Sequence, residues 1–372
     1  MKKSIFPLIL MLLLFGCGSK QSSDGFQGKV LDCEEKETFE MPSLVDHIEF
    51  VKIEENKDAL IGFGPVMKYK NGFYYIMDIV KGDRILVFDS KGKFIHKIGR
   101  KGRGPGEFIK CHAFDVDDLG NVYVVDTYNT RVIKYDRNSK FISEVKIDFL
   151  AKGFRLLSND KFVFLTRKKQ KAYQILVTDQ QCNVIKRYFK FPEECIDTDL
   201  DYKRFSDAKD GVNYIHRQNQ EVYNITSDGE LKPLYKLDFG SLTLSDEYRN
   251  NRGKMIREYR KTKLPHMEFC DSEILVGKDA IYGEIRDFEK KRNGFFKYDL
   301  KGNKMYADFP NKKDRRNINQ IFNPLQLYND SILFSFERNS GGDKINNKDA
   351  LPDNIVAHLE SGGFVICKHI LK

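Results

Sequence analysis

The chain has 372 residues, of which 63 are Lys or Arg and 54 are Asp or Glu, so its formal net charge is +9. A hydrophobic content of 41% and an aromatic content of 13% are typical of a globular protein and exclude an intrinsically disordered chain. At about 150 residues per domain the length predicts two domains, although large all-β folds of this size form a single unit.

A short apolar run at the N-terminus predicts a secretory signal peptide over residues 1–16. Two lysines precede the run at residues 5–15, which is too short to span a bilayer. The run ends in Leu14-Phe15-Gly16-Cys17, which resembles the bacterial lipobox, in which signal cleavage leaves the cysteine first and lipid is attached to it. The resemblance implies a lipid anchor on Cys17 in the cell envelope, and Gly18 favours the outer membrane. The alternative is an ordinary signal peptide with an incidental cysteine.

The composition after this signal predicts two further parts. Residues 17–38 are expected to be the lipidated cysteine and a flexible tether, because residues 18–28 are polar and rich in Ser, Gly and Gln. Residues 39–372 are expected to form the folded domain. Without the signal the net charge falls to +7, and an exported protein of such modest charge is not expected to bind nucleic acid.

The stretch from Gly99 to Asp136 shows the repeating unit of this domain. Apolar segments at residues 114–116, 122–125 and 131–135 are separated by polar turns, which predicts two antiparallel hairpins in tandem. Such a small sheet cannot bury both faces alone, so copies of it must stack.

This stretch resembles an NHL repeat, the blade unit of one class of β-propeller. In NHL blades an Asp-x-x-Asn-x-Arg cluster ties the turn between the second and third strands, and Asp126, Asn129 and Arg131 match it. Asp78 and Arg84 repeat the cluster without the Asn. The preceding residues Gly104, Pro105, Gly106 and Glu107 match the loop between blades, since they lack the ending of a phosphate-binding loop and a following helix.

The same unit recurs with an offset of 47 to 48 residues, which favours four strands per blade. Six segments have the pattern of a third strand: Arg84–Phe88, Arg131–Tyr135, Gln174–Thr178, Glu221–Ile225, Gly294–Tyr298 and Phe364–Lys368. Fourth strands are predicted after the first five: Phe94–Ile98, Phe141–Ile147, Val184–Phe191, Leu231–Phe239 and Lys304–Phe309.

The sixth unit lacks a fourth strand because the chain ends at Lys372, whereas His47–Ile53 is an unassigned strand of the right type. Pairing that strand with Phe364–Lys368 would close the ring, and an open ring would leave a long unpaired edge. We therefore expect an all-β, six-bladed β-propeller of four-stranded antiparallel blades, closed by an N-terminal strand. Deleting the last ten residues is then expected to unfold the whole domain. The overall plan resembles the six-bladed propeller lipoproteins of Bacteroidetes.

Two segments interrupt the rhythm and predict insertions. Residues 244–265 are predicted to be helical, with Ser245 as the N-cap. The polar stretch from Asn339 to Glu360 contains a second short helix from Pro352 to Leu359. Insertions of this kind either carry specificity or decorate the surface.

The sequence predicts no catalytic residue, metal site or cofactor. None of the seven histidines has metal-ligand spacing, and His112, at the start of an innermost strand, could face the central channel.

The six cysteines after Cys17 show no CxxC spacing. Cys111, Cys270 and Cys367 are expected to pack in the core, and Cys182 with Cys195 is the pair to check for a disulfide. Three basic runs, Arg167-Lys168-Lys169, Lys290-Lys291-Arg292 and Lys312-Lys313, are expected at solvated hairpin tips, with contact to anionic lipid or glycan as the alternative.

These observations favour a non-enzymatic binding module, held at the envelope by lipid on Cys17, whose ligand is a protein, peptide or glycan. The alternative is a propeller enzyme of the lactonase, sugar dehydrogenase or lyase type, with a metal or cofactor on the central axis. A third possibility is a structural partner in an envelope complex, which a large exposed apolar patch would favour.

Overall fold

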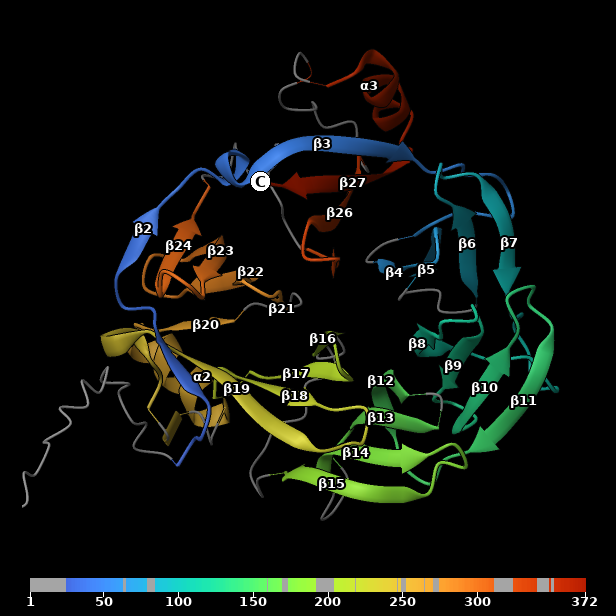
Figure 1. Cartoon of the computed structure of the whole chain (residues 1–372), viewed down its shortest axis with the longest axis horizontal. Helices are drawn as coiled ribbons and strands as arrows, with labels where there is room; N and C mark the ends of the chain where they lie inside the picture. Colours follow the sequence, from blue (N-terminus) through green and yellow to red (C-terminus); the bar gives the residue numbers. More distant parts are fainter. Residues whose placement is uncertain are drawn as a thin grey trace, which may run out of the picture.

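The computed structural model of the chain is a ring of six antiparallel sheets around a central axis (Figure 1). It describes residues 25–62, 65–78, 84–158, 160–168, 173–191, 204–217, 219–245, 247–248, 252–263, 265–269, 274–310, 324–339, 348 and 351–372. The predicted six-bladed propeller of four-stranded blades is confirmed.

The first three blades each contain four consecutive strands, from the axis outward. Blade one consists of β4 (Pro65–Lys70), β5 (Phe73–Asp78), β6 (Ile85–Asp89) and β7 (Phe94–Ile98). Blade two consists of β8 (Cys111–Val116), β9 (Val122–Asp126), β10 (Arg131–Tyr135) and β11 (Phe141–Lys146). Blade three consists of β12 (Ala151–Ser158), β13 (Lys161–Thr166), β14 (Tyr173–Asp179) and β15 (Val184–Lys190).

The other three blades depart from this pattern at their inner or outer edges. Blade four consists of β16 (Phe205–Asp207), β17 (Val212–His216), β18 (Glu221–Ile225) and β19 (Leu231–Asp238). Blade five has two short inner strands, β20 (Met267–Phe269) and β21 (Leu275–Val276), followed by β22 (Ala280–Asp287), β23 (Arg292–Asp299) and β24 (Lys304–Asp308). Blade six consists of β25 (Gln326–Tyr328), β26 (Ile332–Arg338), β27 (Phe364–Leu371) and the N-terminal strand β3 (Val45–Lys52).

The ring closes through the N-terminal strand, as predicted. Strand β3 pairs antiparallel with β27 from Lys52 opposite Val365 to Val45 opposite Leu371. The first and last parts of the chain therefore share one sheet, and blade six cannot form without both.

Residues 29–38, placed in the flexible tether by their composition, instead form two strands. Strand β1 (Lys29–Asp32) adds in parallel to the outer edge of β19, and β2 (Lys36–Thr38) adds in parallel to β24. The segment from β1 to β3 thus runs around the outside of blades four, five and six (Figure 1). We call residues 29–52 the N-terminal belt. A polar composition is compatible with this position because an outer strand buries only one side.

The core lies between neighbouring blades rather than within each blade. The strand β9, for example, is buried over its whole length because both of its faces pack against other blades. Its residues Val122 and Val124 face blade one in one cluster, whereas Tyr123 and Val125 face blade three in another. Six such clusters follow one another around the ring, and a seventh joins the helix α3 (Asp353–Glu360) to blade six.

A recurrent side-chain motif shapes the turn between the third and fourth strands. The Asp89 carboxylate accepts hydrogen bonds from the backbone N–H groups of Lys91 and Lys93, and Asp136 repeats this arrangement in blade two. The turn requires a residue with a positive φ angle, which glycine adopts readily, and the φ angle of Gly92 is 83°. Because such turns depend on local Asp and Gly residues, all five predicted third-to-fourth hairpins are found within two residues of their predicted bounds.

The two insertions contain the helices expected there, the first shorter than its predicted range and the second shifted by one residue. Helix α2 (Arg252–Thr262) lies between blades four and five, and it begins beyond the predicted cap Ser245. Helix α3 begins after Pro352 and covers one side of blade six. Residues 247–248 are also helical, and two 3-10 turns, Met41–Leu44 and Gly240–Leu242, are further short elements of the described residues.

Candidate functional site at the central channel

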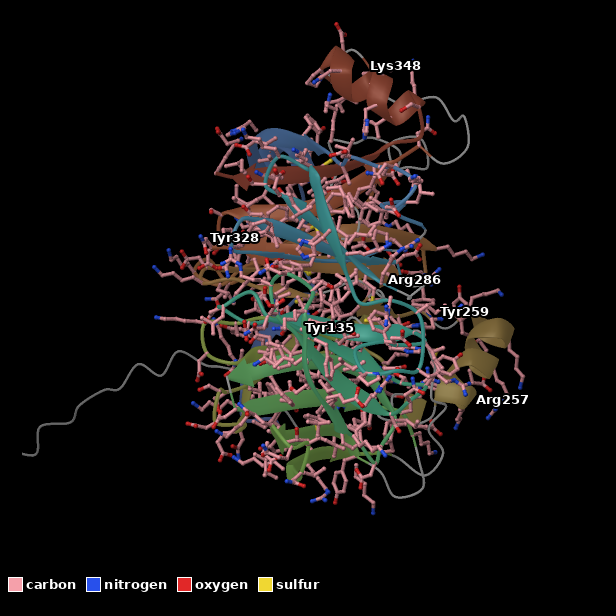
Figure 2. The ribbon with its side chains drawn as sticks, turned by 90° about the vertical axis from the view of Figure 1, so that its right-hand side faces the viewer. Tyr135, Arg257, Tyr259, Arg286, Tyr328 and Lys348 are labelled. Atoms are coloured by element: carbon pink, nitrogen blue, oxygen red, sulfur yellow. The ribbon has the colours of Figure 1, made fainter. Side chains whose placement is uncertain are left out.

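The innermost strands of the blades surround a cavity of about 1090 Å³ on the axis. Residues of β4, β8, β12, β16, β21 and β25 line it, together with the turns that follow these strands. The cavity therefore belongs to the face of the ring that carries the turns between first and second strands. In Figure 2, Tyr328 of blade six marks this face on the left, and Arg286 of β22 and Tyr259 of α2 lie on the opposite side.

Five blades contribute to a network of charged and polar side chains on the cavity wall. Lys68 of β4 lies 2.5 Å from Asp207 of β16 and 3.3 Å from Asp115 of β8. Gln326 of β25 donates a hydrogen bond to the other oxygen of Asp207 at 2.8 Å. Arg155 of β12 stands beside the same group and donates to a backbone carbonyl of blade four at 3.2 Å. Two cations and two anions thus compensate one another inside the channel.

This compensation fixes the charge of its members. Burial alone would lower the pKa of Lys68, but Asp115 and Asp207 together raise the pKa above its ordinary value. Burial alone would raise the pKa of Asp207, yet Lys68, Arg155 and the hydrogen bond from Gln326 lower it to about 2. Both groups are therefore charged at any pH near neutrality.

The cavity wall has a second, less polar part on blades five and six. Val276, Leu327 and Tyr328 line this side. The rings of Tyr328 and Tyr69 meet edge to face at 5.2 Å, and the Gln326 amide fixes Tyr69 by accepting from its N–H at 2.7 Å. The cavity thus offers aromatic and aliphatic surface opposite hydrogen-bonding groups, an arrangement typical of small-molecule sites.

Charges along the lining are nearly balanced. The lining contains five basic residues, at positions 68, 70, 155, 209 and 278, and six acidic residues, at positions 115, 117, 118, 207, 210 and 330. Such a wall attracts neither polyanions nor polycations strongly, and it favours ligands that are neutral or zwitterionic.

The predicted blade motif lies away from the cavity, at the turn between β9 and β10. Asn129 Nδ2 donates to Asp126 Oδ2 at 2.5 Å, and Arg131 Nε lies 3.7 Å from the same oxygen. Arg131 also pairs with Glu144 at 2.7 Å and donates to the backbone carbonyl of Glu107 at 2.7 Å. The three motif residues are therefore brought together, and Arg131 links them to the loop between blades one and two.

That loop contains the predicted residues Gly104, Pro105, Gly106 and Glu107. Glu107 Oε2 accepts from the Gly104 N–H at 2.9 Å, and its other oxygen pairs with Arg100 at 2.7 Å, which together lower the pKa of the Glu107 carboxyl. The Tyr135 hydroxyl donates to the Gly106 carbonyl at 3.0 Å, and Gly106 has a φ of 66°. The loop is thus attached to blade two by β10.

Two blades carry relatives of the motif that sequence analysis missed. In blade five, Arg292 Nε donates to Asp287 at 3.2 Å across the equivalent turn. In blade four, His216 and Glu221 occupy these two positions, 4.0 Å apart, so the acidic residue comes second rather than first. The common five-residue spacing from the end of one strand to the start of the next could have revealed them.

The other predicted residues are placed as follows. Asp78 ends β5 and Arg84 precedes β6, and residues 79–83 between them lie outside the described residues. Cys17, Cys195 and Cys270 also lie outside the described residues. Cys111 and Cys367 are buried as expected, and Cys182 is a free buried thiol.

His112 does not line the cavity, contrary to the possibility considered from sequence. Its ring lies 6.1 Å from that of Tyr128, and burial, with Lys110 and Arg167 nearby, lowers its pKa. The described parts of two basic runs, Arg167-Lys168 and Lys290-Lys291-Arg292, lie at the hairpin ends of blades three and five, as predicted.

Among the described residues, no group of three or more His, Cys, Asp or Glu side chains is arranged to hold a metal ion. No helix in that part of the chain is long and apolar enough to cross a membrane.

Comparison with known proteins agrees with this fold. Residues 29–339 match the model of a family described as "Domain of unknown function (DUF4934)". The structure is similar to that of a "putative exported protein" from Bacteroides fragilis, with a TM-score of 0.73 and 16% identity over 92% of this chain and 100% of that one. This similarity shows the fold alone.

Two further structures are more distant. A DUF4221 family member from Bacteroides vulgatus has a TM-score of 0.49 and 10% identity, covering 88% of this chain and 97% of that one. Virginiamycin B lyase from Staphylococcus aureus has a TM-score of 0.40 and 13% identity, covering 72% and 76%. No curated protein matches the sequence.

Proposed function

The chain belongs to the DUF4934 family, and we propose that this member is a binding module of the cell envelope. The axial cavity is its ligand site, and the ligand is a neutral or zwitterionic hydrophilic molecule, namely a peptide or a glycan. One observation carries the proposal. The charges of Lys68, Asp115, Arg155 and Asp207 compensate one another on the cavity wall, beside the aromatic rings of Tyr69 and Tyr328. Such a network offers fixed hydrogen-bonding groups without a net charge.

The fixed charges favour binding over catalysis by these residues. A general acid or base works best when its pKa is near the working pH. The pKa of Asp207 is about 2 and that of Lys68 is raised, so neither exchanges a proton near neutrality. A lyase or lactonase that used them for proton transfer is therefore disfavoured.

The proposed location depends on the N-terminal sequence. The lipobox-like Leu14-Phe15-Gly16-Cys17 would place lipid on Cys17 and hold the propeller at the outer membrane. The NHL-type blade and the lipoprotein type remain predictions, and the name of the similar exported protein is consistent with them.

Binding is tested with the purified mature chain against panels of short peptides and neutral oligosaccharides, by thermal shift and then calorimetry. We expect Tyr328→Ala, which removes the Tyr328 ring from the cavity wall, to weaken binding of the best ligand at least tenfold. The matched control is Tyr128→Ala, since Tyr128 is 66% exposed and does not line the cavity. Equal weakening by both variants, or conversion of the ligand to a product, would reject the proposal.

A further inference from the structure

Among the described residues, the chain itself covers half of the outer rim of the propeller and leaves the other half uncovered. The N-terminal belt covers the outer edges of β19 and β24 and supplies the outer strand of blade six. In the described part of the chain, β7, β11 and β15 are the outermost strands of blades one, two and three. Figure 1 shows the belt in blue around one side of the ring and these three strands on the other. We call β7, β11 and β15 the open rim.

The open rim carries the same exposed apolar residue in each blade. Ile95, Ile142 and Ile185 are 43%, 47% and 46% exposed, and each is the second residue of its fourth strand. Lys232 and Met305 hold this position in blades four and five, and Met305 is fully buried and lies opposite Lys36 of the belt. Among the described outer strands, exposed isoleucines therefore lie on β7, β11 and β15, the three that the belt does not cover. The three isoleucines lie on different blades, but their recurrence at one position of three neighbouring outer strands distinguishes the open rim from the covered rim.

The open rim is also basic. The fourth strands and their preceding turns, residues 89–98, 136–146 and 179–190, contain nine basic and four acidic residues. The equivalent residues 226–238 and 299–308, beneath the belt, contain four basic and five acidic residues. The open half of the rim is thus the half that would attract an acidic segment.

The belt shows how such a segment binds. Its residues 29–38 contain four acidic and two basic residues. They add to the blades as extended strands, with Glu37 paired to Lys304 and Leu31 fully buried between blades four and five. The same rim thus already accepts an acidic, partly apolar strand elsewhere on the ring.

We propose that the open rim binds an extended acidic segment of another protein, which adds as a fifth strand to one or more of blades one to three. The backbone groups of β7, β11 and β15 supply the ladder, as in other β-strand additions. The exposed isoleucine receives an apolar side chain of the segment.

Basic side chains of the open rim then favour acidic side chains further along the segment. Lys97 in blade one and Arg187 in blade three lie two residues beyond the isoleucine, on the same side of the strand. Lys97 lies 3.7 Å from Asp58, but both side chains are exposed and such a pair is weak. In blade two this position is Glu144, whose charge is compensated by Arg131 at 2.7 Å. The outer edges of blades one and three are therefore the strongest sites.

The test is photocrosslinking of the full-length protein in the cell that produces it, with p-benzoylphenylalanine at position 95, 142 or 185 in turn. The control positions are Leu119 and Tyr128, which are 74% and 66% exposed on other surfaces. Crosslinked peptides are sequenced by mass spectrometry. A synthetic peptide of the captured segment is then titrated against the mature chain, with hydrogen exchange read out strand by strand.

We expect positions 95 and 185 to crosslink to one acidic segment, more strongly than position 142. Its peptide should slow amide exchange in β7 or β15, and binding should fall at least tenfold with Ile95→Lys and Ile185→Lys together. These side chains are exposed, so both substitutions should leave the urea midpoint of unfolding unchanged from that of the parent. Crosslinks no stronger than at the control positions, or to lipid, to a glycan or to a second copy of this chain, would overturn the proposal. So would a captured peptide that leaves exchange on the rim unchanged.

Discussion

At the scale of single residues, Lys68 is the side chain on which the axial network depends. It is 7% exposed and lies within 3.3 Å of two carboxylates from other blades. We expect Lys68→Met to destabilise the protein by about 3–5 kcal/mol, because it leaves Asp115 and Asp207 in the channel without their shared cation. Urea unfolding followed by circular dichroism measures this change.

The matched control is Lys70→Met, two residues further along the same strand. Lys70 is paired with Asp118, but that partner is largely exposed, so the loss should stay below about 1 kcal/mol. If the two variants lost the same amount, the network would contribute no more than a surface ion pair.

The depressed pKa of Asp207 predicts a pH dependence. Its pKa of about 2 in the folded state lies below the value of about 3.9 in an unfolded chain, so its charged form stabilises the fold. This contribution is complete above about pH 5 and is lost as the pH falls through 2. We expect the difference in urea midpoint between the parent and Asp207→Asn to shrink steadily from pH 5 to pH 2. A difference that stayed constant over this range would show that Asp207 acts only through its shape.

The contrast between two clusters shows what the sequence reveals at this scale. Asp126, Asn129 and Arg131 could be identified because they lie within six residues and match a known pattern. Lys68 and Asp207 are separated by 139 residues, and each lies on a strand without an unusual composition. Only the closure of the ring brings them together, so no local pattern could predict the cavity.

At the scale of elements, the first part of the N-terminal belt, residues 29–38, differs from its predicted place in a flexible tether. Leu31 of β1 is fully buried in the cluster between blades four and five. We expect Leu31→Ala to cost about 2–5 kcal/mol, the range for a buried leucine. A flexible tether would tolerate the same change without loss. Chemical unfolding distinguishes these outcomes.

Val30→Ala provides the control within the same strand, since Val30 is only partly buried and its loss should cost about 1 kcal/mol or less. Strands β1 and β2 escaped prediction for a physical reason. They are only four and three residues long, so residues 29–38 are too short a pattern to mark strands by their alternation. The hairpins within blades were predictable because each turn carries its own Asp, Asn or Gly signal.

At the scale of the whole molecule, stability depends on the seam between the two ends of the chain. In that seam Cys367 of β27 lies directly opposite Phe50 of β3. Opposite residues in an antiparallel pair are about 4.5–5.5 Å apart, which is within reach of a disulfide. We expect Phe50→Cys to form a disulfide with Cys367 under mild oxidation. The bond would close a loop of more than 300 residues and raise the unfolding free energy of the oxidised form by about 4–5 kcal/mol over the reduced form.

The control is Val51→Cys, which tests the register of the seam. Successive side chains of a strand point to opposite faces, so a cysteine at position 51 should face away from Cys367 and remain free. Non-reducing mass spectrometry of peptides reports the bond, and thermal unfolding of both redox forms reports its effect. Bonding at position 51 instead would mean that β3 is shifted by one residue. Removal of the last ten residues takes away all of β27 and leaves β3 without a partner. By the same reasoning the ring should open, and the truncated chain should lose its cooperative unfolding transition.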